Sequence, residues 1–392
     1  MNSIGVDYDQ LHCSLALWEA CDGTPVLRVV SDGARTLIPT AVAMGGDGSL
    51  AWGSKAVVAP PPGSIQKRGS LTEVGPWLSS PVTSDFAKGV FQHLKMHLGR
   101  VEPTKRNGYE TVVAALARKE ATSQQVTTLF AGAGFSEVLL IDPCEALLCR
   151  WMGERMGNPA GRDRLPQRVL TVWIGDTGTA CGAFQLGTED GGTIRAESAC
   201  LPNRCLAAGH GHMTARLREM IADRAGGLSE TEEIAVEDAI LEFATRLGKA
   251  SPEEPVEWRG ATASRLFTNL RIRRREVELW PEAVLWKSEL PSLAEAAAKG
   301  LEGTGALELA IFGGIGGIWS CAQGALEEIC HVFSMPEPWV AVASGAAIRP
   351  LFELATANIL NEKASGTSSV KTALSSLSLK HTSGPRPPWE RG

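Results

Sequence analysis

The fold is decided by the stretch Ile4-Gly5-Val6-Asp7-Tyr8-Asp9-Gln10-Leu11-His12-Cys13-Ser14-Leu15-Ala16-Leu17 near the start of the sequence. Apolar residues alternate with small or polar ones on both sides of Asp9-Gln10, which is typical of two strands joined by a turn. The same alternation continues as far as Ala43. We therefore expect an antiparallel run of hairpins over the first fifty residues.

Further along the chain, the patterns indicate that this architecture occurs twice. A helix is expected over 84–98, followed by a β-α-β unit with strands at 111–116 and 138–141 around a helix at 123–133. After a polar loop over 153–168, hairpin strands begin again at 169–174 and 181–186. Helices over 213–225, 230–247 and 281–301 then lead to a second β-α unit, with a strand at 308–312 and a helix at 319–330.

These elements predict an α/β protein of duplicated architecture, with two lobes and a ligand cleft between them. The expected division is 1–168 for the first lobe, 169–362 for the second and 363–392 for a Ser/Pro-rich tail. The composition of the tail predicts that it is largely disordered, with order expected only over 370–379. There, Leu374, Leu377 and Leu379 are spaced so that they could add a strand or dock in a groove.

Composition excludes several classes of protein. The chain has 392 residues, 44% of them hydrophobic and 21% charged, which suits a globular protein with one large core or two ordinary ones. Its apolar runs are broken well before the roughly 20 residues that a membrane span requires. The net charge of −6 is not that of a nucleic-acid-binding protein, and the basic cluster Arg271 to Arg275 is expected on a solvated helix face.

The cysteines and the amino terminus bear on the compartment. Nine cysteines are an odd number, spread along the chain without framework spacing, which favours reduced thiols over a disulfide scaffold. The first residues read as a buried strand and not as a secretory signal peptide. We expect a cytoplasmic protein that contacts neither membrane nor nucleic acid directly.

Four groups of segments, in this order and spacing, resemble the nucleotide-binding domain of the 70-kDa heat-shock chaperones, a branch of the actin-like ATPase superfamily. The opening stretch resembles the first phosphate loop of that family and is followed at the family's distance by 33–40. The segment 112–151 is similar to the family's strand, helix, strand and connecting helix. Segment 172–184 resembles the second phosphate loop, and 311–318 and 342–348 resemble the adenosine motif and the closing helix. The resemblance covers about residues 1 to 360 and implies two lobes flanking a nucleotide cleft.

The resemblance assigns a role to each part of such a site, in which glycine turns cradle phosphates and carboxylates hold Mg²⁺ through water. Asp7 and Asp176 would face the metal, Lys67 would face the phosphates and Asp142 would orient the attacking water. The residues implied to bind the nucleotide are Tyr8, Asp9, Gln10, Gly178, Thr179, Gly313, Gly314, Gly316 and Gly317.

The sequence departs from the family at several of these positions. Asp9-Gln10-Leu11 stands where the family has Gly-Thr-Thr, so a carboxylate lies where phosphate would bind. Two like charges about 4 Å apart repel by roughly 1 kcal/mol in water and by about 4 kcal/mol at an effective dielectric constant of 20. Asp142 is one methylene shorter than the family's glutamate, Ile174 opens the second loop in place of an aspartate, Cys181 replaces the loop's later aspartate, and Gly317 replaces an arginine. We expect binding of ATP or ADP with Mg²⁺ to be weakened or lost.

Each of these residues also has a simpler interpretation. Asp7 could cap a turn, Lys67 could be a surface lysine, and Asp142 before a proline could end a strand. The four glycines could form a loose turn between strand and helix. One further group, Cys200, Cys205, His210 and His212, offers zinc ligands, but its spacing matches no tight two-plus-two pattern, so zinc is not expected.

Three functions remain open at this point. The first is an atypical heat-shock-70-like chaperone or co-chaperone, without the family's substrate-binding domain, that acts as a partner-binding scaffold with a degenerate ATP site. Its partners would be a J-domain co-chaperone or a larger assembly. The second is an active ATP-hydrolysing chaperone of the same type that uses Asp7, Asp142 and Asp176. The third is a small-metabolite kinase of the same superfamily, for which the sequence offers no additional motif.

Overall fold

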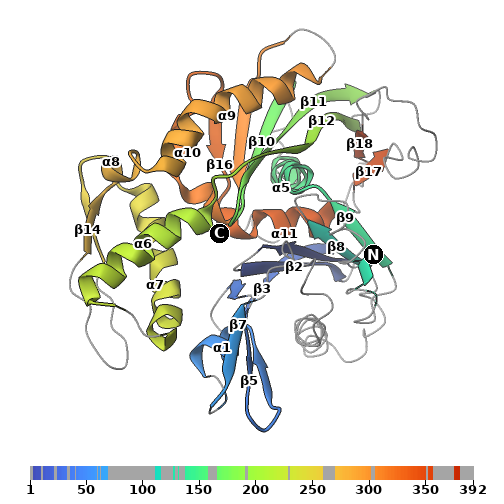
Figure 1. Ribbon diagram of the computed structural model, residues 1–392. Helices are drawn as coiled ribbons and strands as arrows, with labels where there is room; N and C mark the ends of the chain where they lie inside the picture. Colours follow the sequence, from blue (N-terminus) through green and yellow to red (C-terminus); the bar gives the residue numbers. More distant parts are fainter. Residues whose placement is uncertain are drawn as a thin grey trace, which may run out of the picture.

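Figure 1 shows the fold of the chain in a computed structural model. The structure describes residues 3–9, 12–21, 24–32, 36–39, 41–59, 61, 63–68, 111–115, 127–128, 131, 137–157, 166–189, 193–227, 230–258, 270–301, 305–349, 352–355 and 375–379. The helices expected over 84–98 and, for the most part, 123–133 lie outside these ranges.

The first lobe is built on a mixed sheet with the strand order β3-β2-β1-β8-β9. Its antiparallel half consists of β1 (Ser3–Tyr8), β2 (His12–Cys21) and β3 (Thr24–Val30), with β4 (Leu37–Pro39) paired to the start of β2. Strands β8 (Thr111–Ala115) and β9 (Glu137–Ile141) run parallel to β1. The expected hairpin run and β-α-β strands are confirmed here.

The hairpin run does not stay in one sheet. After β4, strands β5 (Ala41–Met44), β6 (Leu50–Trp52) and β7 (Ile65–Arg68) form a separate three-stranded antiparallel sheet. Helix α1 (Ser54–Val58) packs against this sheet and buries Ala56 on Ala43 and Ala51. Figure 1 shows this subdomain projecting from the first lobe, and α1 also approaches helix α7 (Glu230–Lys249) of the second lobe.

The second lobe repeats the arrangement around a sheet ordered β16-β15-β10-β11-β12-β18-β17. Strand β10 (Arg168–Ile174) pairs antiparallel with β11 (Thr179–Glu189) and parallel with β15 (Leu309–Gly313). All seven residues of β10 are buried, as expected for a strand covered on both faces. The remaining strands are β12 (Thr193–Leu206), β16 (His331–Ser334), β17 (Phe352–Ala355) and β18 (Ser375–Leu379).

Two helices lie between the sheets of the two lobes. Helix α5 (Pro143–Gly157) and helix α11 (Pro338–Ile348) pack on each other and share a core with the facing side of the second sheet (Figure 1). Helix α11 also covers the first sheet, where Ala343 and Ala347 meet Ala16. The helices approach so closely that a Cβ on Gly345 would clash with the backbone carbonyl of Ala146.

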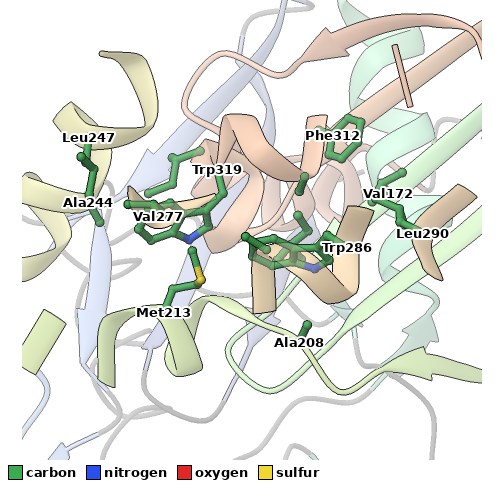
Figure 2. Close-up of a cluster of buried hydrophobic side chains, with 14 of the residues drawn as sticks. Val172, Ala208, Met213, Ala244, Leu247, Val277, Trp286, Leu290, Phe312 and Trp319 are labelled. Atoms are coloured by element: carbon green, nitrogen blue, oxygen red, sulfur yellow. The ribbon is translucent and has the colours of Figure 1, made fainter. Parts of the chain in front are cut away.

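The outer face of the second sheet carries the largest core. Helices α6 (His210–Ala225), α7 and α9 (Pro281–Lys299) bury their apolar faces there, together with Trp286 and Trp319 (Figure 2). Helix α9 lies along this face in Figure 1. Helix α11 thus covers one face of the first sheet, whereas helices cover both faces of the second sheet.

Three expectations about local structure were wrong. The segment 153–168 was expected to be a loop, but α5 continues to Gly157, because Trp151 and Met152 remain buried in the core. The helix expected over 319–330 is only α10 (Ser320–Gly324), after which the chain continues in single turns such as Leu326 N–H to the Gln323 carbonyl.

The basic cluster is also not a helix face. It spans the end of β14 (Leu270–Arg273), which pairs with β13 (Pro255–Trp258), and the start of α8 (Arg274–Val277). Its ion pairs join Arg271 to Glu257, Arg274 to Glu278 and Arg275 to Glu253.

The tail contributes one strand to the second lobe. Strand β18 pairs antiparallel with both β12 and β17 at the edge of the sheet, within the segment 370–379 where order was expected. The other residues of 363–392 lie outside the described ranges. Among the described residues, no helix combines the length and the apolar character needed to cross a bilayer.

Candidate functional site

The first sheet presents two of the expected carboxylates at one edge. Asp7 lies near the end of β1, in register with Ala115 of β8, which is in register with Ile141 of β9. Asp142 follows Ile141 directly. Because the carboxyl ends of parallel strands share an edge, this is where α/β proteins place ligand sites. The structure thus brings Asp7 and Asp142 to the same edge, two strands apart.

The turn after β1 contains Asp9, the acidic residue that stands where the heat-shock family has glycine. Tyr8 is the last residue of β1, and the Asp9 N–H donates a 2.9 Å hydrogen bond to the carbonyl of His12, which closes the turn. Gln10 lies outside the described residues. Lys67 belongs to β7, opposite Val42, and is therefore part of the separate three-stranded sheet and not of the sheet that carries Asp7.

The turn between β10 and β11 forms the opposite wall. The Gly175 N–H donates a 2.9 Å hydrogen bond to the Gly178 carbonyl, which fixes the turn. Asp176 is buried inside it, whereas Thr177 is exposed. The carbonyls of Gly175 and Asp176 are held in turn by the first N–H groups of the α6 region, from His210 at 2.7 Å and Gly211 at 2.8 Å. The turn is thus a rigid unit docked on the start of α6.

The two turns touch each other through a side chain. Oδ2 of Asp9 accepts a 2.5 Å hydrogen bond from the backbone N–H of Asp176. Both residues are buried, at 7% and 1% exposure. A Cβ on Gly175 would clash with this same Asp9 oxygen, so the contact depends on a glycine at that position. Asp9 therefore joins the first lobe to the second at the centre of the expected phosphate site.

Three carboxylates and two histidines gather around this contact. Burial, followed by the nearby charges of Asp9 and Asp176, raises the pKa of Asp7 well above its usual range. The buried Oδ1 of Asp7 accepts no hydrogen bond within the described ranges. Nδ1 of His12 lies 3.9 Å from Oδ1 of Asp176, and burial lowers the pKa of His210 to about 4. His210 is therefore a neutral imidazole at pH 7.

Two tryptophans fix the second turn from behind. Trp286 of α9 donates its indole N–H to the hydroxyl of Thr179 at 2.9 Å, and this hydroxyl donates to the Ala208 carbonyl at 2.6 Å. Trp319 donates its indole N–H to Nδ1 of His210 at 3.2 Å. Figure 2 shows both rings within the outer core of the second lobe. The hydroxyl of Thr179, proposed for nucleotide binding, is engaged in this internal network.

The glycine run after β15 packs closely on the rest of the second lobe. Gly313, Gly314, Gly316 and Gly317 are all buried, and Gly314 has a positive φ of 80°. A Cβ on Gly314 or Gly316 would clash with the backbone or side chain of Ile174 in β10. The Trp173 ring also lies against Gly314. Close packing on β10 therefore accounts for glycine at positions 314 and 316. The role of all four glycines in base binding stays a prediction.

Asp142 starts a helix. Its Oδ1 accepts the Cys144 N–H at 2.8 Å, and its backbone carbonyl accepts the Ala146 N–H at 3.0 Å, so it caps the start of α5. This agrees with the simpler interpretation of the sequence, in which Asp142 ends a strand at a turn before Pro143. Whether Asp142 also orients a water molecule stays a prediction.

The possible zinc ligands are separated by their environments. Cys205 is exposed and His210 is buried, while His212 accepts the N–H of Gly209 at 3.3 Å. No cluster of three or more His, Cys, Asp or Glu side chains in the described part of the chain is arranged to hold a metal ion.

Sequence reasoning missed several residues of this site. His12 lies in the opening stretch but received no role, and His210 was considered only as a zinc ligand. The sequence pattern did not indicate a role for Trp173, Trp286 or Trp319. Each of these side chains contacts residues that are distant in the sequence. The repeated glycines in Gly209-His210-Gly211 could have suggested close packing, since a Cβ on either glycine would clash with or crowd the carbonyl of Asp176.

Comparison with known proteins supports the fold. No family model matches the chain, and no curated protein matches it. Solved structures do match, among them the crystal structure of MreB5 of Spiroplasma citri bound to ADP, with a TM-score of 0.53 and 14% sequence identity. The match covers 88% of this chain and 95% of that chain. It confirms the expected actin-like ATPase fold, and it does not single out the heat-shock branch of that superfamily.

Proposed function

We propose that this chain is an atypical relative of the 70-kDa heat-shock chaperones that works as a partner-binding scaffold and hydrolyses ATP feebly or not at all. The ordered set of sequence motifs supports the relationship, and the actin-like fold is compatible with it. The proposal also places the protein in the cytoplasm, because an odd number of cysteines without framework spacing favours reduced thiols.

The observation that carries the proposal is the hydrogen bond from the Asp176 N–H to the Asp9 carboxylate. Backbone N–H groups at such turns are the donors that cradle phosphate oxygens in nucleotide sites. Here one of these donors already has an anionic acceptor from the same chain. A nucleotide would have to displace this carboxylate and then tolerate its charge.

The surrounding charges add to this cost. Burial raises the pKa of Asp7, and the nearby charges of Asp9 and Asp176 raise it further. The free Oδ1 of Asp7 fits a water molecule of a hydrated Mg²⁺ ion, but the described residues offer no set of three ligands. A metal would therefore need most of its oxygen ligands from water or from a nucleotide, and its chemistry would be to neutralise phosphate charge.

Asp142, the residue expected to orient the attacking water, is also poorly suited to that role. Asp142 is shorter than the family's glutamate, and its carboxylate is hydrogen bonded to the Cys144 N–H at the start of α5. A misplacement of about 1 Å can cost a catalytic group roughly 10²-fold in rate. Slow or absent turnover is the expected consequence.

A turnover assay with Mg-ATP tests the proposal, with Asp7→Ala as the control for the site. We expect the same background rate for the wild-type protein and the variant. Mg²⁺-dependent hydrolysis that Asp7→Ala abolishes would contradict the proposal and favour the active ATPase. A thermal shift adds a binding readout, since ligand at 100 times its Kd stabilises a protein by about 2.7 kcal/mol.

The scaffold role is tested by direct binding to a purified partner. The probe is a J-domain protein from the same organism, titrated by calorimetry in the absence of nucleotide and with Mg-ATP. We expect the same affinity under both conditions. Affinity that requires ATP, or no binding to the J-domain protein, would contradict this part of the proposal.

A further inference from the structure

The structure assigns Asp9 a second role: we propose that its carboxylate is an internal substitute for a nucleotide phosphate, which latches the two lobes together and blocks the site against nucleotide. This inference concerns the regulation of the same site and rests on the proposed function only for the identity of the ligand that is blocked. The latch itself is a contact within this chain.

The geometry of the acceptor supports the latch. The donor and the acceptor are 167 residues apart, on the facing turns of the two lobes, and their hydrogen bond is 2.5 Å long and buried. Hydrogen bonds to a charged acceptor are about twice as strong as neutral ones, and burial protects this one from competing water. It is therefore a specific attachment between the lobes.

The donor side is held in place by hydrogen bonds that do not involve Asp9. The turn is closed by the Gly175 to Gly178 hydrogen bond, and its carbonyls at 175 and 176 are fixed by the start of α6. The Asp176 N–H therefore points at Asp9 from a rigid frame. An N–H fixed in this way loses little entropy when it binds an anion.

Glycine at position 175 leaves room for the carboxylate. A Cβ there would clash with Oδ2 of Asp9 and with the ring of Trp173. The chain thus combines a carboxylate on one turn with a bare backbone on the other. The same space and the same N–H would be required by a phosphate oxygen, so the two occupants exclude each other.

Hydrogen exchange of the Asp176 amide in the full-length protein tests the latch directly. Loss of a hydrogen bond to a charged group, about 1.5–3 kcal/mol, corresponds to about tenfold or faster exchange. We expect this acceleration in Asp9→Ala and a smaller one in Asp9→Asn, which keeps the shape without the charge. Asp47→Ala, at an exposed turn, is the control for the loss of one carboxylate and should leave the Asp176 amide unchanged.

Unchanged exchange in folded Asp9→Ala would overturn the latch. If that variant does not fold, Asp9→Asn decides, and exchange equal to that of the wild type would then overturn it. This readout does not depend on ATP turnover. Mg²⁺-dependent hydrolysis would contradict the proposed function and leave the hydrogen bond standing, whereas unchanged exchange would remove the hydrogen bond on which both proposals rest.

Calorimetry with Mg-ADP tests the blocking role. Removal of the charge and its side chain in Asp9→Gly is expected to raise the affinity for Mg-ADP at least about tenfold over the wild type, because several kcal/mol of repulsion is relieved. Equal affinity in Asp9→Gly and the wild type would overturn the claim that Asp9 excludes the nucleotide.

Discussion

Trp286 and Thr179 are joined by a buried hydrogen bond from the indole Nε1 to the hydroxyl oxygen, 2.9 Å long, which ties helix α9 to the first residue of β11. The hydroxyl in turn donates a hydrogen bond to the Ala208 carbonyl, just before α6. One side chain on a distant helix thus fixes both the second turn and the helix on which that turn is docked.

Replacement of Trp286 by Phe should therefore destabilise the protein considerably. The variant loses an indole donor and leaves a cavity in a fully buried site, which together correspond to about 3 kcal/mol in the free energy of unfolding. Chemical denaturation measures this. Trp339→Phe is the matched control, because Trp339 donates to a threonine hydroxyl, that of Thr36, from a half-buried position. Equal losses in the two variants would contradict the importance of the buried network.

The stability of the protein should fall as the pH decreases from about 6.5 to about 4, in part because of His210. Burial lowers the pKa of this histidine to about 4 in the folded state, against about 6.5 in the unfolded chain. The unfolded state therefore takes up the proton first as the solution is acidified. The contribution is on the order of 3 kcal/mol, fully present above pH 6.5 and lost as the pH falls to 4.

The His210→Asn variant isolates this contribution, since it keeps an acceptor for Trp319 without a group that titrates. Its stability measured against pH should be flatter than that of the wild type over this window. Asp7 acts in the opposite direction, because its pKa is raised in the folded state, but it is present in both proteins. His331→Asn, at an exposed position, should show the wild-type curve. Parallel curves for the wild type and His210→Asn would exclude the assigned role.

A methyl group on Gly345 should disrupt the contact between the central helices. Its Cβ would clash with the Ala146 carbonyl, so α5 and α11 would have to separate, at an expected cost of about 3 kcal/mol. Gly324→Ala is the control in another helix, where an added Cβ meets no atom within 4 Å. This change should be neutral or stabilise by up to about 1 kcal/mol. Thermal denaturation of both variants checks the difference, and a neutral Gly345→Ala would refute the close approach.

Two variants of Asp142 separate its possible roles. As a helix cap alone, Asp142→Ala should cost about 1 kcal/mol of stability, whereas Asp142→Asn, which still offers an oxygen to the Cys144 N–H, should cost less. Neither change should alter a background rate of ATP hydrolysis. If Asp142→Asn keeps the stability but abolishes a measurable Mg²⁺-dependent turnover, then Asp142 also serves the chemistry.

Much of the local structure was accessible from sequence because its causes are local. The alternation from Ile4 to Leu17 gave β1 and β2, and the order of the motifs gave the duplicated fold. The length of α10 was overestimated because an amphipathic pattern does not distinguish a continuous α-helix from the single turns that follow Gly324, such as Leu326 N–H to the Gln323 carbonyl. The length of α5 was underestimated. Burial of Trp151 and Met152 favours the helix more than the polar, glycine-containing sequence that follows them disfavours it.

The sequence by itself determined that a carboxylate stands at position 9, where the heat-shock family that the sequence resembles has glycine, and that this charge opposes phosphate. Only the tertiary structure decided that the same carboxylate has a partner, the Asp176 N–H on the other lobe. The physical reason is that residue type and local pattern set the charge and the turn, whereas a hydrogen bond between positions 167 residues apart depends on how two separately folded sheets are brought together by α5 and α11.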